Sequence, residues 1–533
     1  MSSQRSSSAR WALAIGAVAL AVPVAAWTGT AQANDHGEYF TRISTFPVFE
    51  NNADRSVETV AEIVDYWSNG QELVYTDGEG DQIGFVDISD PADPQARPDD
   101  NVALDGEPTS VSVVENASNS VKSDYALVGV NTSESFVDPS GYLAVVDLAT
   151  KSVVAELELG GQPDSVKVGP SGDYVAIVIE NERDEDLIVD GVEGGLEQPP
   201  PGLLQVVKLR GEPQNWKVKD VDLTGLAAYG ADDPEPEFVD VNDDELAVVS
   251  LQENNHVAIV DLRTRTVVGG FDAGAVDLVD IDNVEDDLII FQDDLDDVVR
   301  EPDAIAWVGQ NVATANEGDL FGGSRGFSIF EQDGTLLYDA ASTFDELARD
   351  IGHYPDNRSE NKGSEPESIA YDRYDGVGHL FVGSERGSFV GVYLGAEDGD
   401  AELHQVLPAG LGPEGLLTIP ERDLLVVSSE VDDPTFGVRA TITIYGYGAT
   451  APAYPEVVSA DDEALVDDGV GWSAMSGMVA TGDGATALAV WDSFYAESKV
   501  FTLDLGVTPA EVVDHVTITK DDEPVGYELE GIA

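Results

Sequence analysis

A repeated sequence pattern is the feature that most constrains how this chain can fold. Each copy places a proline before an acidic or small polar residue, and a short apolar stretch follows. The prolines lie 47 to 73 residues apart, and a degenerate earlier copy begins at Val60-Ala61-Glu62-Ile63. The six clear copies, with the degenerate one seven in all, are centred on Pro108, Pro163, Pro236, Pro302, Pro366 and Pro413. Units that recur at this period bury their apolar faces only by packing on their neighbours.

The apolar residues inside each unit alternate or run for four to seven positions, as they do in β-strands. Leu246–Leu251 is followed by Val257–Leu262, and Leu380–Gly383 is followed by Phe389–Tyr393. Three or four short antiparallel strands per unit are typical of a propeller blade. We therefore predict an all-β fold, a β-propeller of seven blades over residues 38–450, with extra C-terminal strands. Stacked β-sandwiches remain the structural alternative, because strand patterns alone do not fix ring closure.

Acidic residues recur at one phase of the repeat. The residue after the proline and the residue at the end of the next strand form pairs, such as Asp164 with Glu180, that are separated by 14 to 18 positions. In a propeller these two positions meet at one mouth of the central channel, so up to a dozen carboxylates would gather there. Closely spaced carboxylates repel one another and favour binding of a hard cation, with calcium the best match to oxygen ligands. The alternative is a solvated acidic rim. The predicted calcium ligands are Glu237, Glu253, Glu317, Asp319, Glu367, Glu385 and Glu430, with Lys362 and Arg386 as weaker candidates for binding an anion.

The charge of the chain excludes several partners. It has 103 acidic and 26 basic residues in 533, a formal net charge of −77 and no cysteine. We expect no nucleic-acid partner, because counterion release requires basic residues facing the phosphates. The absence of cysteine excludes disulfides and thiolate metal sites. Acids spread along the whole chain predict a halophilic source, since the screening length falls to about 3 Å in molar salt and removes most of the self-repulsion.

The first 33 residues have the pattern of a signal peptide. Arg5 and Arg10 form a basic start, Trp11–Ala26 is an apolar run, and Ala31-Gln32-Ala33 is a small-x-small cleavage site. An uncleaved anchor is the alternative. No later stretch approaches the 18 apolar residues of a membrane span. We expect a secreted or periplasmic protein that has no integral membrane segment after cleavage and is a monomer.

A serine-hydrolase pattern is also present, at Gly322-Gly-Ser324-Arg-Gly326. That chemistry requires a helix directly after the serine. A strand-like segment, Phe327–Phe330, follows instead. We therefore do not assign Ser324 as a nucleophile.

Several multi-residue blocks resemble a known family. Glu235-Pro-Glu-Phe-Val239, Leu251-Gln-Glu-Asn-Asn-His256, Ala315-Asn-Glu-Gly-Asp319 and Lys362-Gly-Ser-Glu-Pro-Glu367 look like those of the choice-of-anchor I propeller proteins. These secreted bacterial proteins are often labelled alkaline-phosphatase-like and show distant similarity to mesenchyme-specific cell-surface glycoproteins. Trp472–Gly477, Val490–Phe494 and Tyr527–Ala533 resemble the opening of an "esterase-like activity of phytase" domain. The resemblance implies a propeller and phosphoester hydrolysis with calcium, and it implies that residues 451–533 start a second propeller. We expect this second propeller to be truncated; the alternative is that its strands close or flank the first.

Two functions remain open on this basis. The first is a secreted calcium-binding propeller that hydrolyses phosphate esters, a phosphoric ester hydrolase acting on a small-molecule phosphoester. The second is a non-catalytic extracellular or envelope propeller that binds calcium, a glycan or a protein ligand at the cell surface. No catalytic residue can be assigned from the sequence, and the fold does not decide between them.

Overall fold

The strands follow the apolar runs of the sequence. The computed structural model describes residues 38–116, 121–460, 471–482, 484–527, 529 and 531–532, so the predicted signal peptide 1–33 lies outside the described residues. The run Tyr-Val-Ala-Ile-Val-Ile forms strand β12 (Tyr174–Ile179), which is buried along its whole length. The mixed sequence Ser-Val-Val-Ala-Glu-Leu-Glu forms β10 (Ser152–Glu158), which is largely half-buried or exposed. Continuous apolar runs mark strands covered on both faces, and mixed runs mark strands at a sheet edge.

Four-stranded antiparallel sheets recur along the chain. The first sheet contains β2 (Val64–Trp67), β3 (Glu72–Asp77), β4 (Gln82–Asp87) and β5 (Gln95–Ala96), and a fifth short strand, β6 (Val102–Ala103), also pairs with β4. The second contains β7 (Glu107–Val114), β8 (Tyr125–Asn131), β9 (Gly141–Asp147) and β10. The third contains β11 (Pro163–Val168), β12, β15 (Leu203–Lys208) and β16 (Val218–Val221). The fourth sheet contains β17 (Pro236–Val241), β18 (Leu246–Leu251), β19 (His256–Asp261) and β20 (Thr266–Asp272). The fifth contains β23 (Ile305–Val308), β24 (Asn311–Asn316), β25 (Gly326–Phe330) and β26 (Leu336–Asp339). The sixth contains β27 (Pro366–Tyr374), β28 (Val377–Ser384), β29 (Phe389–Leu394) and β30 (Glu402–Pro408).

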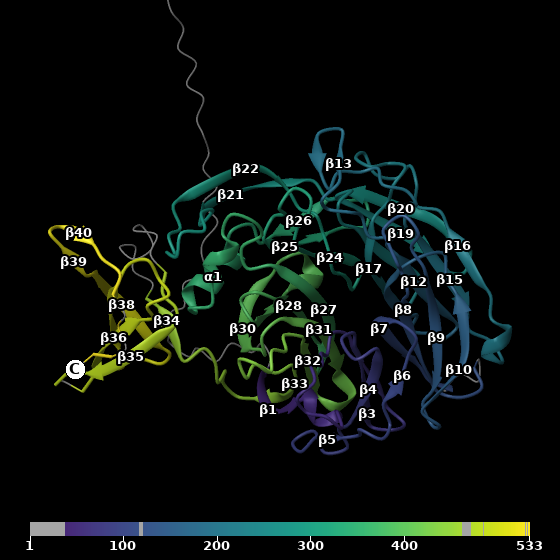
Figure 1. Cartoon of the computed structure of the whole chain (residues 1–533), viewed down its shortest axis with the longest axis horizontal. Helices are drawn as coiled ribbons and strands as arrows, with labels where there is room; N and C mark the ends of the chain where they lie inside the picture. The colour runs from purple at the N-terminus through teal and green to yellow at the C-terminus, as the bar shows by residue number, and fades with distance from the viewer. Residues whose placement is uncertain are drawn as a thin grey trace, which may run out of the picture. The chain divides into compact units, whose positions relative to one another are not determined.

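One more sheet closes the series. It contains β31 (Pro413–Ile419), β32 (Leu424–Ser429) and β33 (Thr441–Ala449), and its fourth strand is β1 (Tyr39–Pro47) from the other end of the described chain. The first strands contact one another in the closed order β2, β7, β11, β17, β23, β27, β31 and back to β2. Figure 1 shows these sheets arranged around a centre. The predicted all-β propeller is confirmed, and seven sheets take part in this closed order.

Apolar side chains fill the spaces between neighbouring sheets. In one such cluster Ala176 and Val206, from the sheet of β12, pack with Val249 from the sheet of β18, and all three are buried. Each fully buried aliphatic side chain of valine size contributes about 1.5–3 kcal/mol to stability. This inter-sheet packing explains why the repeat demands a ring.

A separate sheet follows the ring. Its strands are β34 (Val457–Ser459), β35 (Met475–Ala480), β36 (Thr486–Trp491), β37 (Lys499–Asp504) and β38 (Ala510–Thr517), in the order β34-β38-β37-β36-β35. Strands β35 to β38 form an antiparallel meander like that of a blade, and Ser476 Oγ donates a 2.8 Å hydrogen bond to Asp492. Trp491 packs in the same cluster as Phe344 of helix α1 (Thr343–Asp350). The interpretation of residues 451–533 as the start of a second propeller stays a prediction.

The remaining elements are short. They are the hairpins β13 (Ile188–Val189) with β14 (Val192–Glu193), β21 (Ala275–Ile281) with β22 (Asp293–Val299) and β39 (Thr519–Lys520) with β40 (Glu523–Pro524), and the 3-10 helices η1 (Val48–Asn51), η3 (Pro213–Asn215), η4 (Asp356–Arg358), η5 (Ala396–Asp398) and η6 (Pro420–Arg422). Within the part of the chain that the structure describes, no helix has the length and apolar character needed to cross a membrane.

Candidate metal centre

A recurring β-bulge directs the acid after each proline. Pro163, Pro236, Pro366 and Pro413 each begin the first strand of a sheet, where a missing N–H is tolerated. The pairing register shifts directly after each of these prolines, as between Pro163 and Val166. A bulge breaks the regular alternation of side chains and re-aims one of them. The side chains after these four prolines, Asp164, Glu237, Glu367 and Glu414, all line one cavity.

That cavity lies where the first strands begin and the second strands end. We call this end of the ring the channel mouth. The cavity has a volume of about 270 Å³. Its acidic lining residues are Asp164, Glu180, Glu182, Glu185, Glu237, Glu253, Asp303, Glu317, Asp319, Glu367 and Glu414. Both members line the cavity in three of the five acid pairs that follow a proline, while Glu385 and Glu430 are not among its lining residues.

Two sets of three carboxylates are close enough to share an ion. In the first carboxylate group, one oxygen from each of Asp164, Glu180 and Glu237 lies within 4.8 Å of the others. In the second carboxylate group, Asp303, Glu317 and Glu367 meet the same limit. Each group joins two neighbouring sheets, since Glu237 belongs to the sheet after that of Asp164, and Glu367 to the sheet after that of Asp303. An ion held by either group would connect two blades.

The predicted ligands divide between these groups and ion pairs. Glu237, Glu317 and Glu367 belong to the carboxylate groups. Glu253 lies 3.3 Å from the guanidinium of Arg183, and Asp319 also pairs with Arg183. Glu385 lies 3.0 Å from Arg386. Glu430 directly follows strand β32, and burial raises the pKa of its carboxyl while the Arg386 charge partly offsets that rise. The seven predicted ligands are thus not one cation shell.

Three group members were absent from the predicted ligand set. Asp164, Glu180 and Asp303 complete the two carboxylate groups. Their positions were visible in the sequence, because Asp164 with Glu180 and Asp303 with Glu317 are pairs of the repeat. What the sequence did not show is which pairs stay free of a basic neighbour, and Arg183 gave no sequence signal.

Burial and mutual repulsion disfavour the charged form of these acids. Burial, with a contribution from Glu182, raises the pKa of Asp164 to about 7. Burial and then the neighbouring carboxylates hold the pKa values of Glu180, Glu237, Asp303 and Glu367 well above the ordinary range. Burial, then Glu430 and Glu107, raise the pKa of Glu62 to about 8. A bound cation would relieve this cost by stabilising the ionised carboxylates.

Some carboxylate oxygens lack any partner. Glu253 is 4% exposed, and its Oε2 atom has no hydrogen bond, although Oε1 contacts Arg183. Glu367 Oε2 and Glu414 Oε2 are likewise buried without a hydrogen bond. A buried, unsatisfied polar atom is costly unless a ligand, ion or water completes it. These atoms belong to residues that line the mouth cavity.

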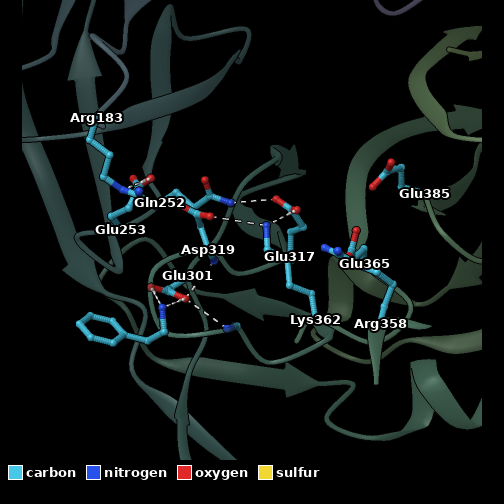
Figure 2. A network of polar contacts seen from close by, with 12 residues as sticks. Arg183, Gln252, Glu253, Glu301, Glu317, Asp319, Arg358, Lys362, Glu365 and Glu385 are labelled. Atoms are coloured by element: carbon cyan, nitrogen blue, oxygen red, sulfur yellow. Dashed lines mark hydrogen bonds and ion pairs between the residues drawn. The ribbon is translucent and has the colours of Figure 1, made fainter. Parts of the chain in front are cut away.

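The two bases predicted to bind an anion are held by carboxylates. Lys362 Nζ donates to Glu317 at 2.8 Å and lies 3.6 Å from Asp319 (Figure 2). Arg386 donates to Glu365 at 2.7 Å. Burial lowers the pKa of Lys362, but the Glu317 and Glu365 carboxylates together raise it more, so that this pKa lies above its ordinary value. Both side chains already have anionic partners within the chain.

The donor set fits a hard cation. The carboxylate groups supply only oxygen, and the residues lining the mouth cavity include no histidine. Oxygen-only, flexible carboxylate sites suit calcium and magnesium rather than zinc or copper.

Ser324 of the serine-hydrolase pattern is 1% exposed, its Oγ atom has no hydrogen-bond partner, and strand β25 follows it. Among the residues that the structure describes, none therefore hydrogen-bonds to this Oγ atom as a base would.

The fold and this site define a β-propeller with an acidic channel mouth. A sequence model of the choice-of-anchor I domain matches residues 62–322 and 320–397, and the chain belongs to this family. Membership indicates an extracellular or cell-surface protein. The match does not extend to the phosphatase-like and phytase-like parts of the resemblance.

A solved structure supports the propeller fold. The WD40 repeats of RRP9 align with a TM-score of 0.50 and 8% identity, over 77% of this chain and 100% of that one. A catalytically inactive virginiamycin B lyase from Staphylococcus aureus, solved with quinupristin, aligns with a TM-score of 0.47 and 10% identity, over 76% and 99% of the two chains. No curated protein matches the chain in sequence. At these identities the likeness concerns the fold alone.

Proposed function

We propose that this protein is an exported, non-catalytic propeller that holds divalent cations, calcium foremost, between neighbouring blades at its channel mouth. The observation that carries the proposal is the pair of carboxylate groups, each within 4.8 Å and each shared by two sheets. An ion in either position would be bound by carboxylates of two blades, so their mutual repulsion would be replaced by attraction to the same cation. The raised pKa values and unpaired oxygens described above support the same reading.

Hydrolysis of a phosphate ester has less support. A calcium-dependent hydrolase needs an ion with an open coordination position, and a free basic residue would help such an ion to hold the phosphate. Lys362 and Arg386 contact carboxylates instead. We therefore favour the cell-surface binding function over phosphoester hydrolysis, and hydrolysis is tested on the same samples.

Calcium titration of the chelated full chain in molar NaCl tests the proposal. Isothermal titration calorimetry should show two ions per chain. Glu180→Gln with Glu237→Gln should leave one, because the two carboxylates are removed without loss of volume. The matched control is Asp375→Asn, an exposed acid in the turn between β27 and β28 at the opposite end of the ring. Absence of calcium uptake by the folded wild type would refute the proposal.

Phosphomonoester turnover is measured on the same samples. We expect none above the protein-free rate when the carboxylate groups are calcium-loaded. Turnover that disappears with a chelator, and with the Glu180→Gln and Glu237→Gln changes, would restore the hydrolase reading.

A further inference from the structure

The two ends of the ring differ in their connections. In each sheet the first strand begins beside the end of the second, as Pro163 pairs with Ile179. The loops after second strands and after fourth strands therefore lie on the same face as the channel mouth, which we call the mouth face. The turns after first and third strands lie on the opposite face. This division follows from antiparallel order alone.

Exposed apolar side chains are concentrated on the mouth face. Among the described residues of 38–450, the exposed large apolar side chains lie in mouth-face connections, apart from Ile43, Val268 and Leu336 on fourth strands. The opposite face carries none in its described turns. We define the apolar rim as Phe136, Val137, Leu187, Ile188, Phe321 and Phe436. Scattered exposed apolar residues are normal on a soluble protein, whereas this set is confined to the connections of one face of the ring.

The outermost rim residues stand clear of the protein. Phe436 is 84% exposed, Val137 is 78% exposed and Ile188 is 68% exposed. They lie in the second-to-third-strand loops of three different sheets. Apolar side chains held out in water in this way contribute nothing to the core and gain free energy when a partner covers them.

Several rim loops are fixed to the mouth by ion pairs and hydrogen bonds. Arg183, on the loop that carries Ile188, pairs with Glu253 and Asp319. The backbone N–H of Phe321 donates to the buried Glu301 carboxylate at 2.9 Å (Figure 2). Arg439 pairs with Asp432 at the base of the Phe436 loop at 2.6 Å. Anchored loops lose little entropy on binding, so they suit recognition.

The centre of this face is anionic and incompletely satisfied. Glu253, nine-tenths buried and lining the cavity, keeps one oxygen without a partner. Glu414 also lines it with an unpaired oxygen, and it belongs to neither carboxylate group. A cationic group entering the mouth would pair with such atoms in a partly buried site, where salt screens less than at an open surface.

We propose that the mouth face docks a basic, partly apolar polypeptide segment, with a lysine or arginine side chain in the channel mouth and apolar neighbours on the rim. The inference rests on the proposed function in one respect, since it requires that the mouth carboxylates take up cations. Binding hot spots are enriched in aromatic and arginine side chains that become buried in the interface.

Charge decides against two other occupants. A second copy of this chain would bring another surface of a protein whose formal charge is −77, so like charges would oppose each other. An anionic bilayer would be repelled for the same reason, and the Phe436 and Ile188 loops carry acids such as Asp433 and Glu185 close to their tips. A basic partner is attracted to the same face.

Fluorescence anisotropy with a labelled short peptide of alternating lysine and leucine tests the proposal on the full chain, in the lowest NaCl that keeps it folded. The rim variant combines Val137→Ser, Ile188→Ser and Phe436→Ser. The control variant combines Ile43→Ser, Val268→Ser and Leu336→Ser, which removes exposed apolar groups away from the mouth. We expect the rim variant to bind at least about tenfold more weakly and the control variant to match the wild type.

The other arms separate the possible failures. A lysine–serine peptide should bind more weakly than the lysine–leucine peptide, and a glutamate–leucine peptide should not bind. Equal peptide binding by wild type and rim variant would overturn the inference, even if calcium titration still gives two ions. Rim-dependent peptide binding without calcium uptake would instead refute the calcium proposal alone. Binding to phosphatidylglycerol vesicles, or self-association, in place of peptide binding would also overturn it.

Discussion

The two carboxylate groups are built on the same repeat position and differ in their neutralisation. Asp303, Glu317 and Glu367 have Lys362 beside them, with its Nζ atom 2.8 Å from Glu317. Asp164, Glu180 and Glu237 have no basic side chain within ion-pair distance among the described residues. One group therefore carries an internal cation and the other does not. The repeat therefore positions the acids, while a residue outside the repeat, Lys362, decides how strongly each carboxylate group requires an ion from solution.

Salt should produce the largest effect, because it acts on the whole acidic surface. We predict that unfolding free energy drops by about 5 kcal/mol or more between molar NaCl and tens of millimolar NaCl with a chelator, enough to unfold a domain of ordinary stability. Circular dichroism during denaturant titration measures it. Full stability of the chelated protein at low salt would show that neither group's charge is costly and would remove the basis of the comparison.

Calcium bound at the two carboxylate groups should stabilise the folded protein to different extents. At a calcium concentration about 100 times the dissociation constant, each filled site adds about 2.7 kcal/mol. We expect Glu180→Gln with Glu237→Gln to lose most of the calcium-induced rise in melting temperature, and Asp303→Asn with Glu367→Gln to lose less. Differential scanning calorimetry with and without calcium compares the pairs. Equal losses would contradict the assigned difference.

Replacing Lys362 should make the two groups alike. In Lys362→Gln the competing ammonium is gone, so calcium affinity of the second group should rise about tenfold, which corresponds to about 1.4 kcal/mol. The metal-free variant should be less stable than the wild type, since Glu317 loses its partner. Calorimetric titration measures the affinity, with Lys219→Gln on exposed β16 as control. An unchanged affinity would show that Lys362 does not compete with the ion.

The last effect depends on pH and concerns Glu62, which belongs to neither carboxylate group. Its pKa of about 8 in the folded protein exceeds the unfolded value, so the folded state binds more protons between about pH 5 and pH 8. Metal-free stability should therefore rise as pH falls through this window, by at most about 1.4 kcal/mol per pH unit for this one proton. Glu62→Gln should flatten the slope of denaturant-derived free energy against pH. If the variant has the same slope as the wild type, the proton taken up on folding binds to a group other than Glu62.

The sequence predicted the parts of this molecule that are repeated. The propeller follows from periodic prolines and strand-length apolar runs, and the gathering of Asp164, Glu237 and Glu367 at one mouth follows from the repeat phase. The bulge after each proline was not anticipated, yet it is what turns these side chains inward. The halophilic source, the signal peptide and the second propeller stay predictions.

Contacts made by residues outside the repeat could not be predicted. Arg183 lies in a long loop after β12 and reaches Glu253 and Asp319, which are 70 and 136 positions away. Lys362 reaches Glu317 from the segment before β27. Such long-range pairs depend on the course of loops that carry no periodicity. This is why Glu253 and Asp319 appeared in the sequence as ligands and lie in the structure as partners of an arginine.

The pairing of β1 with β33 sets an order of events during synthesis. Tyr39–Pro47 is made long before Thr441–Ala449, with which it must pair. Until β33 is made, β1 has no partner strand and the series of sheets keeps an open edge at each end. Closure of the ring is therefore a late event for this chain, which follows the synthesis of everything between those two strands.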